Sequence, residues 1–386
     1  MGKTVNTPII IVVSRNKKLL NFVCLSILII ILMAGLWPFN VNPPNRVHWL
    51  PADPGIRIDG PGHLYGPGYL WQEVYNTPFT LELWLRPAQE PNNRLPHILS
   101  YWDGQRQEVF LLGQWKDALA IRIRTQNLKA SRGYRERGCE RILLKDQDVF
   151  LTLTSSRKET VIYYQGRPVK EIPGFFLLED RGQNPGTVIL GNSADGRHFW
   201  KGRVFGLAFY DRALSADEIA QNCSHWWMKD YQKLNSIPGL LALYPFAEGK
   251  GPWAADFTGQ AGPFFIPDSF SPLKNMILEW PSREYMKRMS FYEDLAINVL
   301  GFIPLGFFFP LWLIFTTRLN SRKAFVLTFL IGSLVSLGIE LAQVYLPGRD
   351  SSASDLVCNM VGTLIGLALL HWGPKNIILT ARSFLA

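Results

Sequence analysis

Four apolar stretches, each long enough to cross a lipid bilayer, constrain the fold of this 386-residue chain more than any other feature. A helix rises about 1.5 Å per residue, so about 20 apolar residues cross a hydrocarbon core of about 30 Å. The stretches are Leu19–Trp37, Leu295–Phe315, Ala324–Leu346 and Leu356–Trp372. Because lipid offers the backbone no hydrogen-bonding partner, such stretches cross it as helices. We therefore predict a bundle of four transmembrane helices.

The net charge of +9 supports a membrane arrangement rather than nucleic-acid binding. Residues 38–290 carry 30 Lys and Arg against 26 Asp and Glu, so five of the nine positive charges lie beside the apolar stretches. No motif that reads nucleic-acid grooves accompanies this charge. Basic residues are retained on the cytoplasmic side of a membrane. Along this chain, flanks of the apolar stretches that are rich in Lys and Arg alternate with flanks that have few. We expect both termini in the cytoplasm and the region after the first helix outside it.

A cleaved signal peptide is the alternative to the first transmembrane helix. Ala34 and Gly35 offer a small-residue cleavage site near its end. The length of the apolar stretch favours an uncleaved anchor. Both interpretations place the following residues outside the cytoplasm.

After the first helix, the sequence pattern changes to that of short strands. One face of the stretch FTLELWLRP would carry Phe79, Leu81, Leu83 and Leu85, and the other Thr80, Glu82, Trp84 and Arg86. This alternation predicts a half-buried strand. Many similar runs, separated by turn residues, predict an antiparallel β-sandwich of jelly-roll type. One helix is expected after them, because Ser215 and Glu218 have the spacing of a capping box.

Three motifs of this region occur together in a known family. They are FTLELWLRP at 79–87, VIYYQGRPV at 161–169 and FWKGRVFGLAFYDRALSADEI at 199–219. With them, residues 50–230 resemble the concanavalin A-like lectin/glucanase family of the laminin G type. The segment 239–259 usually precedes such a domain but follows it here, and we expect it to return and complete the sandwich.

These features divide the chain into six predicted segments. They are a cytoplasmic N-terminus (1–18), the first helix (19–37), an external sandwich (45–270), an interfacial linker (271–293), a membrane domain of three helices (294–372) and a cytoplasmic tail (373–386). The linker mixes Trp280 and Tyr285 with Arg283, Lys287 and Arg288, which suits lipid headgroups. An ordinary domain linker is the alternative.

Polar side chains interrupt the last three predicted helices at a similar depth. Glu340 and Gln343 lie three residues apart, and Asp355 and Asn359 four apart, so each pair shares a helix face. A charge at the bilayer centre costs about 2.5–3.5 kcal/mol, so its presence requires a partner or a function. Glycines at 301, 306, 332, 338, 362 and 366 are expected to serve close helix contact.

We predict a ligand-binding site from these polar residues. Its members are Asn298, Glu340, Gln343, Arg349, Asp355 and Asn359. The planar guanidinium of arginine suits phosphate or carboxylate groups, so a lipid-linked or glycan headgroup is the expected ligand. In the alternative, the amides only hold the helices together and Arg349 neutralises Glu340 or Asp355.

The same region resembles a second family. NVLGFIPLGF at 298–307, IELAQVYLPGRDSSASDL at 339–356 and NMVGTLIG at 359–366 are similar to the VanZ-like family of small bacterial membrane proteins. The family is named for an accessory of glycopeptide-antibiotic resistance, and the similarity covers residues 290–372. It implies a protein of the bacterial inner membrane and cell envelope, with no established reaction.

The sandwich offers weaker candidate sites. No strand carries two carboxylates two or four residues apart, so the paired carboxylates of a glycosidase are not expected, and a glycan-cleaving enzyme is the less favoured alternative. Asp103 and Asp195 each precede glycine and could bind calcium, although turn formation explains them equally well. Trp84, Trp102 and Trp115 could stack on sugars, although most of them are expected in the core.

Two further features leave alternatives open. Cys139 and Cys223 could form one disulfide outside the cytoplasm. Residues 129–145 carry six cations against two carboxylates and form either a solvated loop or a contact for anionic lipid. No other cofactor is expected. The expected partners are membrane lipids, an envelope glycan or lipid-linked precursor, or another envelope protein, as for a membrane-anchored interaction scaffold.

Overall fold

The computed structural model forms two compact units, Asn42–Lys274 and Met1–Val41 with Asn275–Ala386. The residues that it describes are 17–68, 74, 76–88, 95–104, 108–125, 133–177, 186–281, 286, 289–317, 319–346, 349 and 351–372. The predicted terminal segments therefore lie outside the described residues, except for Lys17 and Lys18. The same holds for Arg283, Tyr285, Lys287 and Arg288 of the predicted linker and for residues 129–132 of the basic segment.

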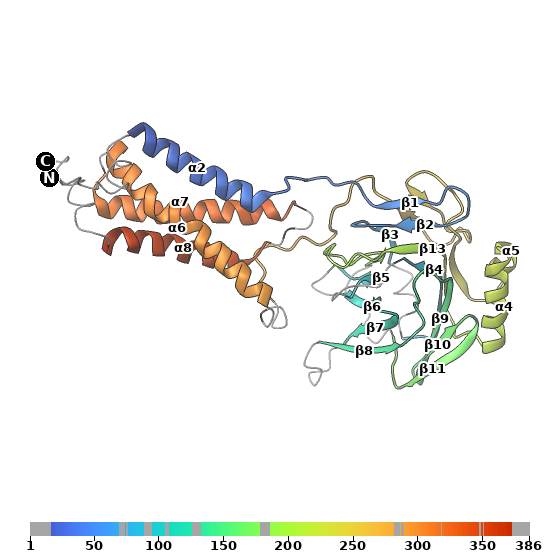
Figure 1. Cartoon of the computed structure of the whole chain (residues 1–386). Helices are drawn as coiled ribbons and strands as arrows, with labels where there is room; N and C mark the ends of the chain where they lie inside the picture. The colour runs from blue at the N-terminus through green and yellow to red at the C-terminus, as the bar shows by residue number, and fades with distance from the viewer. Residues whose placement is uncertain are drawn as a thin grey trace, which may run out of the picture. The chain divides into compact units, whose positions relative to one another are not determined.

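The unit Asn42–Lys274 is a sandwich of two antiparallel sheets (Figure 1). Its first sheet has the strand order β1–β2–β13–β4–β9–β10–β11, and β14 also pairs with β13. The strands are β1 (Val47–Trp49), β2 (Ile56–Ile58), β4 (Phe79–Pro87), β9 (Val149–Ser155), β10 (Glu159–Tyr164), β11 (Arg167–Pro173), β13 (Gly202–Tyr210) and β14 (Leu240–Tyr244).

The second sheet has the strand order β15–β16–β3–β12–β5–β6–β7–β8. Its strands are β3 (Leu64–Pro67), β5 (His97–Trp102), β6 (Glu108–Trp115), β7 (Ala118–Arg124), β8 (Tyr134–Cys139), β12 (Thr187–Leu190), β15 (Trp253–Ala254) and β16 (Phe264–Phe265). Because β14 joins the first sheet and β15 the second, the segment 239–259 does return to complete the sandwich, as predicted.

The space between the sheets is filled by the inward side chains of both. Leu81, Leu83 and Leu85 of β4 are fully buried there, as the alternation predicts. The opposite face of β4 departs from the prediction, because Thr80, Glu82 and Trp84 are also buried. The strand is therefore buried on both faces and not half-buried.

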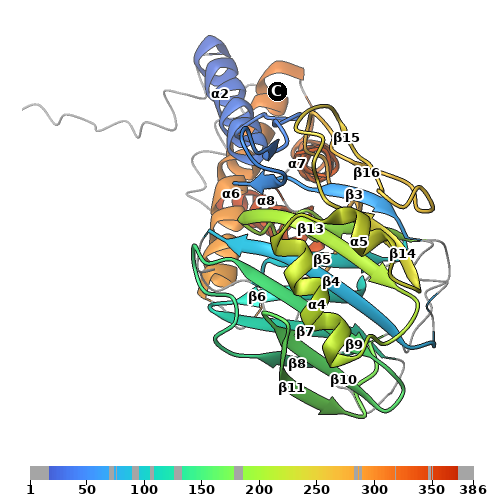
Figure 2. The ribbon, with the colours of Figure 1, turned by 90° about the vertical axis from the view of Figure 1, so that its right-hand side faces the viewer.

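Helix α4 (Ala216–Trp227) is the cause of this second burial, because it lies across the outer face of the first sheet (Figure 2). The short helix α5 (Tyr231–Asn235) follows it. Ile219, Cys223 and Trp226 of α4 pack with Trp84 of β4 in an apolar cluster outside the main core. The predicted capping box is confirmed, since the Ser215 side chain accepts from the Glu218 backbone N–H and Glu218 accepts from that of Ser215.

The four cysteines of the chain are free thiols in this structure. Cys223 lies on the buried face of α4, next to Gly166. Cys139 lies at the end of β8 in the other sheet and packs against the main core. The disulfide considered for this pair is therefore not formed, because the two cysteines belong to different clusters.

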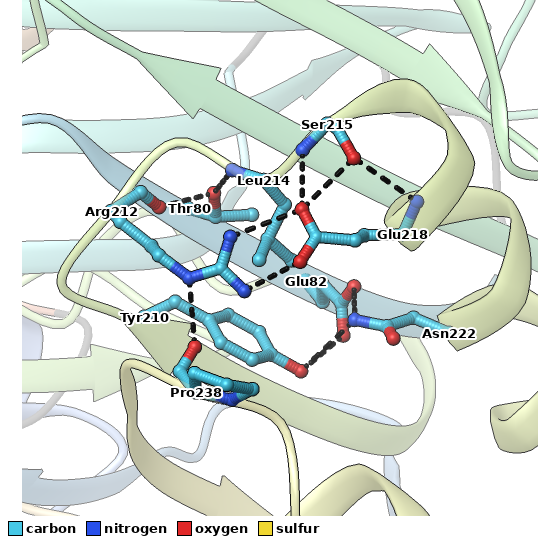
Figure 3. A network of polar contacts seen from close by, with 9 residues as sticks. All are labelled: Thr80, Glu82, Tyr210, Arg212, Leu214, Ser215, Glu218, Asn222 and Pro238. Atoms are coloured by element: carbon cyan, nitrogen blue, oxygen red, sulfur yellow. Dashed lines mark hydrogen bonds and ion pairs between the residues drawn. The ribbon is translucent and has the colours of Figure 1, made fainter.

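A buried carboxylate fastens α4 to the first sheet (Figure 3). Oε1 of Glu82 accepts from Asn222 Nδ2 at 2.8 Å, and Oε2 accepts from the Tyr210 hydroxyl at 3.1 Å and from Trp226 Nε1 at 2.9 Å. Burial raises the pKa of Glu82 to about 7, although these three hydrogen bonds oppose the shift. Glu82 thus binds its proton more tightly in the folded protein than in the unfolded chain.

This raised pKa predicts a pH-dependent stability of the sandwich. The contribution of Glu82 is fully present below pH 4.5 and is lost as the pH rises through about 7. A shift of this size corresponds to roughly 3 kcal/mol. We expect Glu82→Gln to flatten the fall of the unfolding free energy between pH 5 and pH 8. Denaturant unfolding of the full chain in detergent would measure this, with the exposed Glu171→Gln as control; equal pH slopes for all three proteins would contradict it.

The other unit holds four long helices, which lie side by side (Figure 1). They are α2 (Lys17–Leu36), α6 (Met289–Thr317), α7 (Ser321–Gln343) and α8 (Ala353–Trp372). All four are long and apolar enough to cross a membrane. The predicted fold class, a helical membrane bundle with an inserted antiparallel sandwich, is confirmed. The second helix begins at Met289 rather than Leu295, so its first turns come from the predicted linker.

Glycines let α6 and α8 approach at backbone distance. A Cβ added at Gly362 would lie 2.2 Å from the Val299 carbonyl oxygen, and one at Gly306 would lie 2.1 Å from that of Thr363. Gly366 meets the Ile303 carbonyl in the same way. Small residues allow such contacts in membranes. The prediction of close helix contact is confirmed at these glycines, whereas a Cβ at Gly301 or Gly338 would meet no heavy atom within 4 Å.

This contact predicts opposite effects for two glycine substitutions. Gly362→Ala should force α6 and α8 apart and destabilise the bundle by about 1–3 kcal/mol. Gly338→Ala should be neutral or stabilise α7 by up to about 1 kcal/mol, because alanine favours the helix and nothing obstructs its Cβ. Thermal unfolding of both variants in detergent checks the pair. Equal unfolding temperatures would show that the α6–α8 contact is not close.

Candidate functional site

Polar side chains gather where α2 and α7 end and α8 begins. Glu340 on α7 is only 1% exposed, and its Oε2 accepts the backbone N–H of Ser352 at 2.7 Å. Asp355 lies in the first turn of α8, and its Oδ1 accepts from the Ser354 hydroxyl at 3.3 Å. Glu340 contacts the loop between α7 and α8, and Asp355 lies just after that loop.

The two buried amides connect the helices. Asn359 Nδ2 on α8 donates to the Ser336 hydroxyl on α7 at 2.9 Å. Gln343 Nε2 on α7 donates to the Gly35 carbonyl on α2 at 2.8 Å. Ser336, Glu340 and Gln343 follow one another at successive turns on one face of α7, and separate hydrogen bonds join this face to α2 and α8. We define the polar layer as Ser336, Glu340, Gln343, Asp355 and Asn359.

Arg349 does not pair with the carboxylates of this layer. Its Nε donates to the Trp37 carbonyl at 2.8 Å and its Nη2 to the Ala34 carbonyl at 3.1 Å. Carbonyls at a helix C-terminus have no intrahelical donor, and a cation there interacts favourably with the helix dipole. Among the described residues Arg349 forms no ion pair, so the expectation that it neutralises Glu340 or Asp355 is wrong for this structure.

The loop between α7 and α8 also holds the segment that precedes α6. The Ser351 hydroxyl accepts from the Leu278 backbone N–H at 3.1 Å, and the Ser351 carbonyl accepts from that of Glu279 at 3.3 Å. Ala353 N–H donates in turn to the Glu279 carbonyl. The loop therefore fastens both chain segments that lead to the sandwich, residues 34–37 and residues 278–279.

Asn298 is the predicted site residue that the structure leaves apart from this network. It lies half-buried on α6, and its side chain forms no hydrogen bond within the part of the chain that the structure describes. The structure thus joins four of the six predicted residues in one layer and places Arg349 at the end of α2. Whether the six bind a ligand stays a prediction.

The aspartates considered for calcium in the sandwich already have protein partners. The Asp103 carboxylate is buried and receives Arg124 Nη2 at 2.6 Å. Asp195 Oδ1 accepts from the Ser193 hydroxyl and from the Arg197 backbone N–H in a turn. No group of three or more His, Cys, Asp or Glu that could hold a metal occurs among the described residues. Calcium at these positions stays a prediction.

Two stacked histidines and a glutamate form a further titratable group in the sandwich. The rings of His97 and His198 lie 4.8 Å apart, and Oε1 of Glu108 accepts the Ala194 backbone N–H at 3.2 Å. Burial lowers the pKa of His97 well below its usual value and raises the pKa of Glu108. His198 Nδ1 contacts the Leu95 carbonyl at 3.1 Å. These contacts fasten the loop after β12 to β5 and β6.

Sequence reasoning missed a row of aromatic side chains on the second sheet. Tyr65 pairs with Phe265 across β3 and β16, and Phe265 pairs with Trp253 across β16 and β15. The ring centroids are 5.6 Å apart in the first pair and 4.6 Å in the second. Partners in register share a sheet face, and Trp253 is 52% exposed, so the row lies on the outer face. The sequence did carry a signal, because successive residues of a strand face opposite sides of a sheet. Phe264 and Ala254, the neighbours of Phe265 and Trp253, are buried, so Phe265 and Trp253 point outward.

The tryptophans singled out from the sequence lie elsewhere. Trp84 is buried beneath α4, where its ring packs against Phe205 and Trp227. Trp102 is partly buried at the end of β5, and Trp115 is exposed at the turn between β6 and β7. Only Trp115 of these three offers an open ring to a sugar.

The contact of Arg349 with α2 predicts a local effect of its replacement. Arg349→Lys keeps the charge but loses the planar guanidinium that reaches two carbonyls. Loss of about 1 kcal/mol of hydrogen bonding should speed amide exchange in the last turn of α2 about fivefold. Hydrogen exchange followed by mass spectrometry measures this, with Arg322→Lys at the exposed start of α7 as the matched control. Unchanged exchange in residues 30–37 would contradict the contact.

Two protein families match the chain. The VanZ/LLP1 family matches residues 241–374, and the concanavalin A-like lectin/glucanases superfamily, in its laminin G form, matches residues 69–220. Both resemblances drawn from the sequence are confirmed. The VanZ/LLP1 match begins within β14 and so includes the last strands of the sandwich, well before residue 290. No curated protein matches the chain.

The chain is also similar to solved structures at low sequence identity. A putative carbohydrate binding protein from Bacteroides ovatus shares 15% identity, with 60% of this chain and 62% of that chain covered and a TM-score of 0.37. The CBM40 of a Ruminococcus gnavus IT-sialidase, solved with α2,3-sialyllactose, shares 14%, with 46% and 96% covered and a TM-score of 0.34. The receptor binding domain of a botulinum neurotoxin C/D mosaic serotype shares 11%, with 47% and 45% covered and a TM-score of 0.37. This chain thus spans less than two thirds of the Bacteroides protein and of the neurotoxin domain.

Proposed function

We propose that this membrane protein, which joins a VanZ-like helical bundle to a concanavalin A-like sandwich, binds a glycan of the bacterial envelope through the sandwich. The membrane is the inner membrane, and the sandwich lies on its outer side. The polar layer of the bundle serves as a second site, for the headgroup of a lipid-linked component. The row of Tyr65, Phe265 and Trp253 is the observation that carries the glycan proposal.

An aromatic row on the outer face of a sheet suits a carbohydrate for a physical reason. Outward positions of a sandwich strand are usually polar, so three adjacent aromatic side chains there need a binding partner or a cover. Aromatic rings bury a large area at low entropic cost, and the C–H face of a sugar ring can pack on them. The row crosses three neighbouring strands, which lie about 4.8 Å apart, so it offers an extended contact to a chain of sugars.

The basic side chains of the sandwich give weaker support for a glycan site than the aromatic row does. Arg135 and Arg137 of β8 extend over the Phe175 ring, and Arg122 pairs with Glu136, so part of the basic segment is used within the sandwich. These contacts favour the interpretation of β8 as a folded edge strand over that of a free basic loop. They leave the aromatic row as the stronger recognition surface.

A membrane-anchored interaction scaffold is the second candidate function. It is favoured by the hydrogen bonds of Gln343 and Asn359, which join α7 to α2 and to α8 and so give the polar residues a purely structural role. In a scaffold the polar layer only assembles the bundle. The two functions differ in whether the sandwich binds a glycan.

The glycan proposal predicts a selective loss of binding. Trp253→Ala should weaken binding of the full chain, in detergent, to a panel of oligosaccharides that includes peptidoglycan fragments by about tenfold, the effect of losing a large aromatic contact. Trp115→Ala, an exposed tryptophan outside the row, is the matched control and should bind normally. Isothermal titration calorimetry measures both. A wild-type chain that binds no oligosaccharide, or an equal loss in both variants, would leave the scaffold as the better account.

A further inference from the structure

The edge strands β8 and β11 lie at the same end of the sandwich and carry basic side chains on their inner faces (Figures 1 and 2). β8 is the last strand of the second sheet, and β11 is the last strand of the first. Arg135 and Arg137 of β8 pair with Ile123 and Ile121 of β7, which are buried in the main core. Partners in register share a sheet face, so both arginines lie on the core side of their sheet.

The inner face of β11 also carries a cation. Lys170 pairs with Ile162 of β10, another member of the main core. Its Nζ donates to the Gly138 carbonyl of β8 at 2.5 Å, so this side chain spans from the first sheet to the second. Arg135 Nη2 spans in the other direction and donates at 2.7 Å to the Gly174 carbonyl, just after β11. We define the basic edge as Arg135, Arg137 and Lys170.

The carboxylates of the same two strands face away from the basic edge. Glu136 lies between the two arginines and Glu171 directly follows Lys170, so both point to the outer faces of their sheets. Within the described part of the chain, neither Arg137 nor Lys170 forms an ion pair, and their hydrogen bonds go to backbone carbonyls. Their charge is therefore not neutralised by a neighbouring carboxylate.

Protection of the edge strands explains only part of this charge. An inward-pointing cation keeps an edge strand from pairing with another chain, and one on each strand is enough for that. Here both arginines of β8 extend over the Phe175 ring, with their guanidinium carbons 5.2 Å and 5.8 Å from its centre. Like charges this close repel each other, and a bound anion would remove the repulsion. Guanidinium groups suit the oxygens of a carboxylate or a phosphate.

An acidic polysaccharide fits the basic edge better than an anionic membrane does. A single chain can lie along the edge, whereas a flat bilayer would also meet the exposed carboxylates Glu136, Glu140 and Glu171. The basic edge is also remote from the ends of the sandwich, which meet where Pro44, just before β1, bridges to Ser269, just after β16. Six strand spacings separate β1 from β11, and six separate β16 from β8, which is about 30 Å along each sheet.

We infer that the basic edge binds an acidic polysaccharide, a glycan chain that bears carboxylate or phosphate groups. This site goes beyond the proposed function, because the aromatic row lies on β3, β15 and β16, at the other end of the second sheet. The two sites share no residue, so either can be lost without the other.

Binding of charged and neutral oligomers to the full chain in detergent tests the basic edge. Oligogalacturonate carries carboxylates, a phosphomannan oligosaccharide carries phosphates, and a maltooligosaccharide of the same length is the neutral reference. We expect at least one of the two anionic oligomers to bind about tenfold more tightly than the neutral one, and less tightly as salt screens the charges. The preferred oligomer identifies the anionic group.

Substitutions on the two edge strands assign this binding to the basic edge. Arg137→Gln should weaken binding of the anionic oligomer up to about fivefold, the upper range for one exposed ion pair. Combined with Lys170→Gln, the loss should reach at least about tenfold. Arg203→Gln, which removes an exposed arginine from β13, is the matched control and should leave binding unchanged.

Cys139 gives a second readout that does not depend on affinity. This thiol is half-buried and packs against the main core on the inner face of β8, whereas the other three cysteines are buried. Burial raises the pKa of Cys139, and the nearby Lys170 ammonium opposes the shift. A bound anionic oligomer should slow labelling of Cys139 by N-ethylmaleimide in the wild type but not in the double variant.

The inference is overturned by any of three results. They are no preference for either anionic oligomer over the neutral one, an equal loss in Arg203→Gln, and Arg137-dependent binding to phosphatidylglycerol vesicles without binding to either oligomer, which would assign the edge to a membrane. Trp253→Ala should bind the anionic oligomers normally. A failure of the glycan proposal at the aromatic row and a failure at the basic edge are therefore separate results.

Discussion

The hydrogen bond from the Ser352 backbone to Glu340 is the contact on which the membrane unit depends. A buried carboxylate must be satisfied, and this one is satisfied by the loop between α7 and α8. The same loop then holds the end of α2 through Arg349 and the segment before α6 through Ser351. One polar residue inside a helix thus orders the loop that fixes both segments leading to the sandwich. Glu340 and Arg349, which belong to the motifs of the VanZ-like resemblance, therefore have a structural role.

A second buried carboxylate has a comparable role in the sandwich. Glu82 gathers donors from β13 and α4, and so ties a helix to the outer face of the first sheet. The helix covers one sheet, while the aromatic row lies on the outer face of the other. The two outer faces therefore differ in chemistry.

Features encoded over a short range could be predicted from the sequence. The capping box of α4, the four apolar helices and the alternation in β4 each depend on residues within a few turns or one strand. The partners of polar side chains could not be predicted in this way. Arg349 donates to a carbonyl 312 residues away in the sequence. Glu82 accepts from Trp226, which lies 144 residues away on the helix that covers it. The shared helix face of Glu340 and Gln343 could be predicted from their spacing. The partner of Arg349 could not, because charge alone suggests a carboxylate and the local sequence does not show that the end of α2 lies nearby.

The chain segments at the two ends of the sandwich lie together. Pro44 bridges to Ser269, and the Asn45 N–H donates to the Asp268 carbonyl at 3.0 Å, so the first and last residues of the insertion meet. A module whose ends close on each other can be gained by a single genetic insertion or lost by a single deletion. The geometry at this junction thus offers a simple evolutionary route by which a small membrane protein acquires an additional domain.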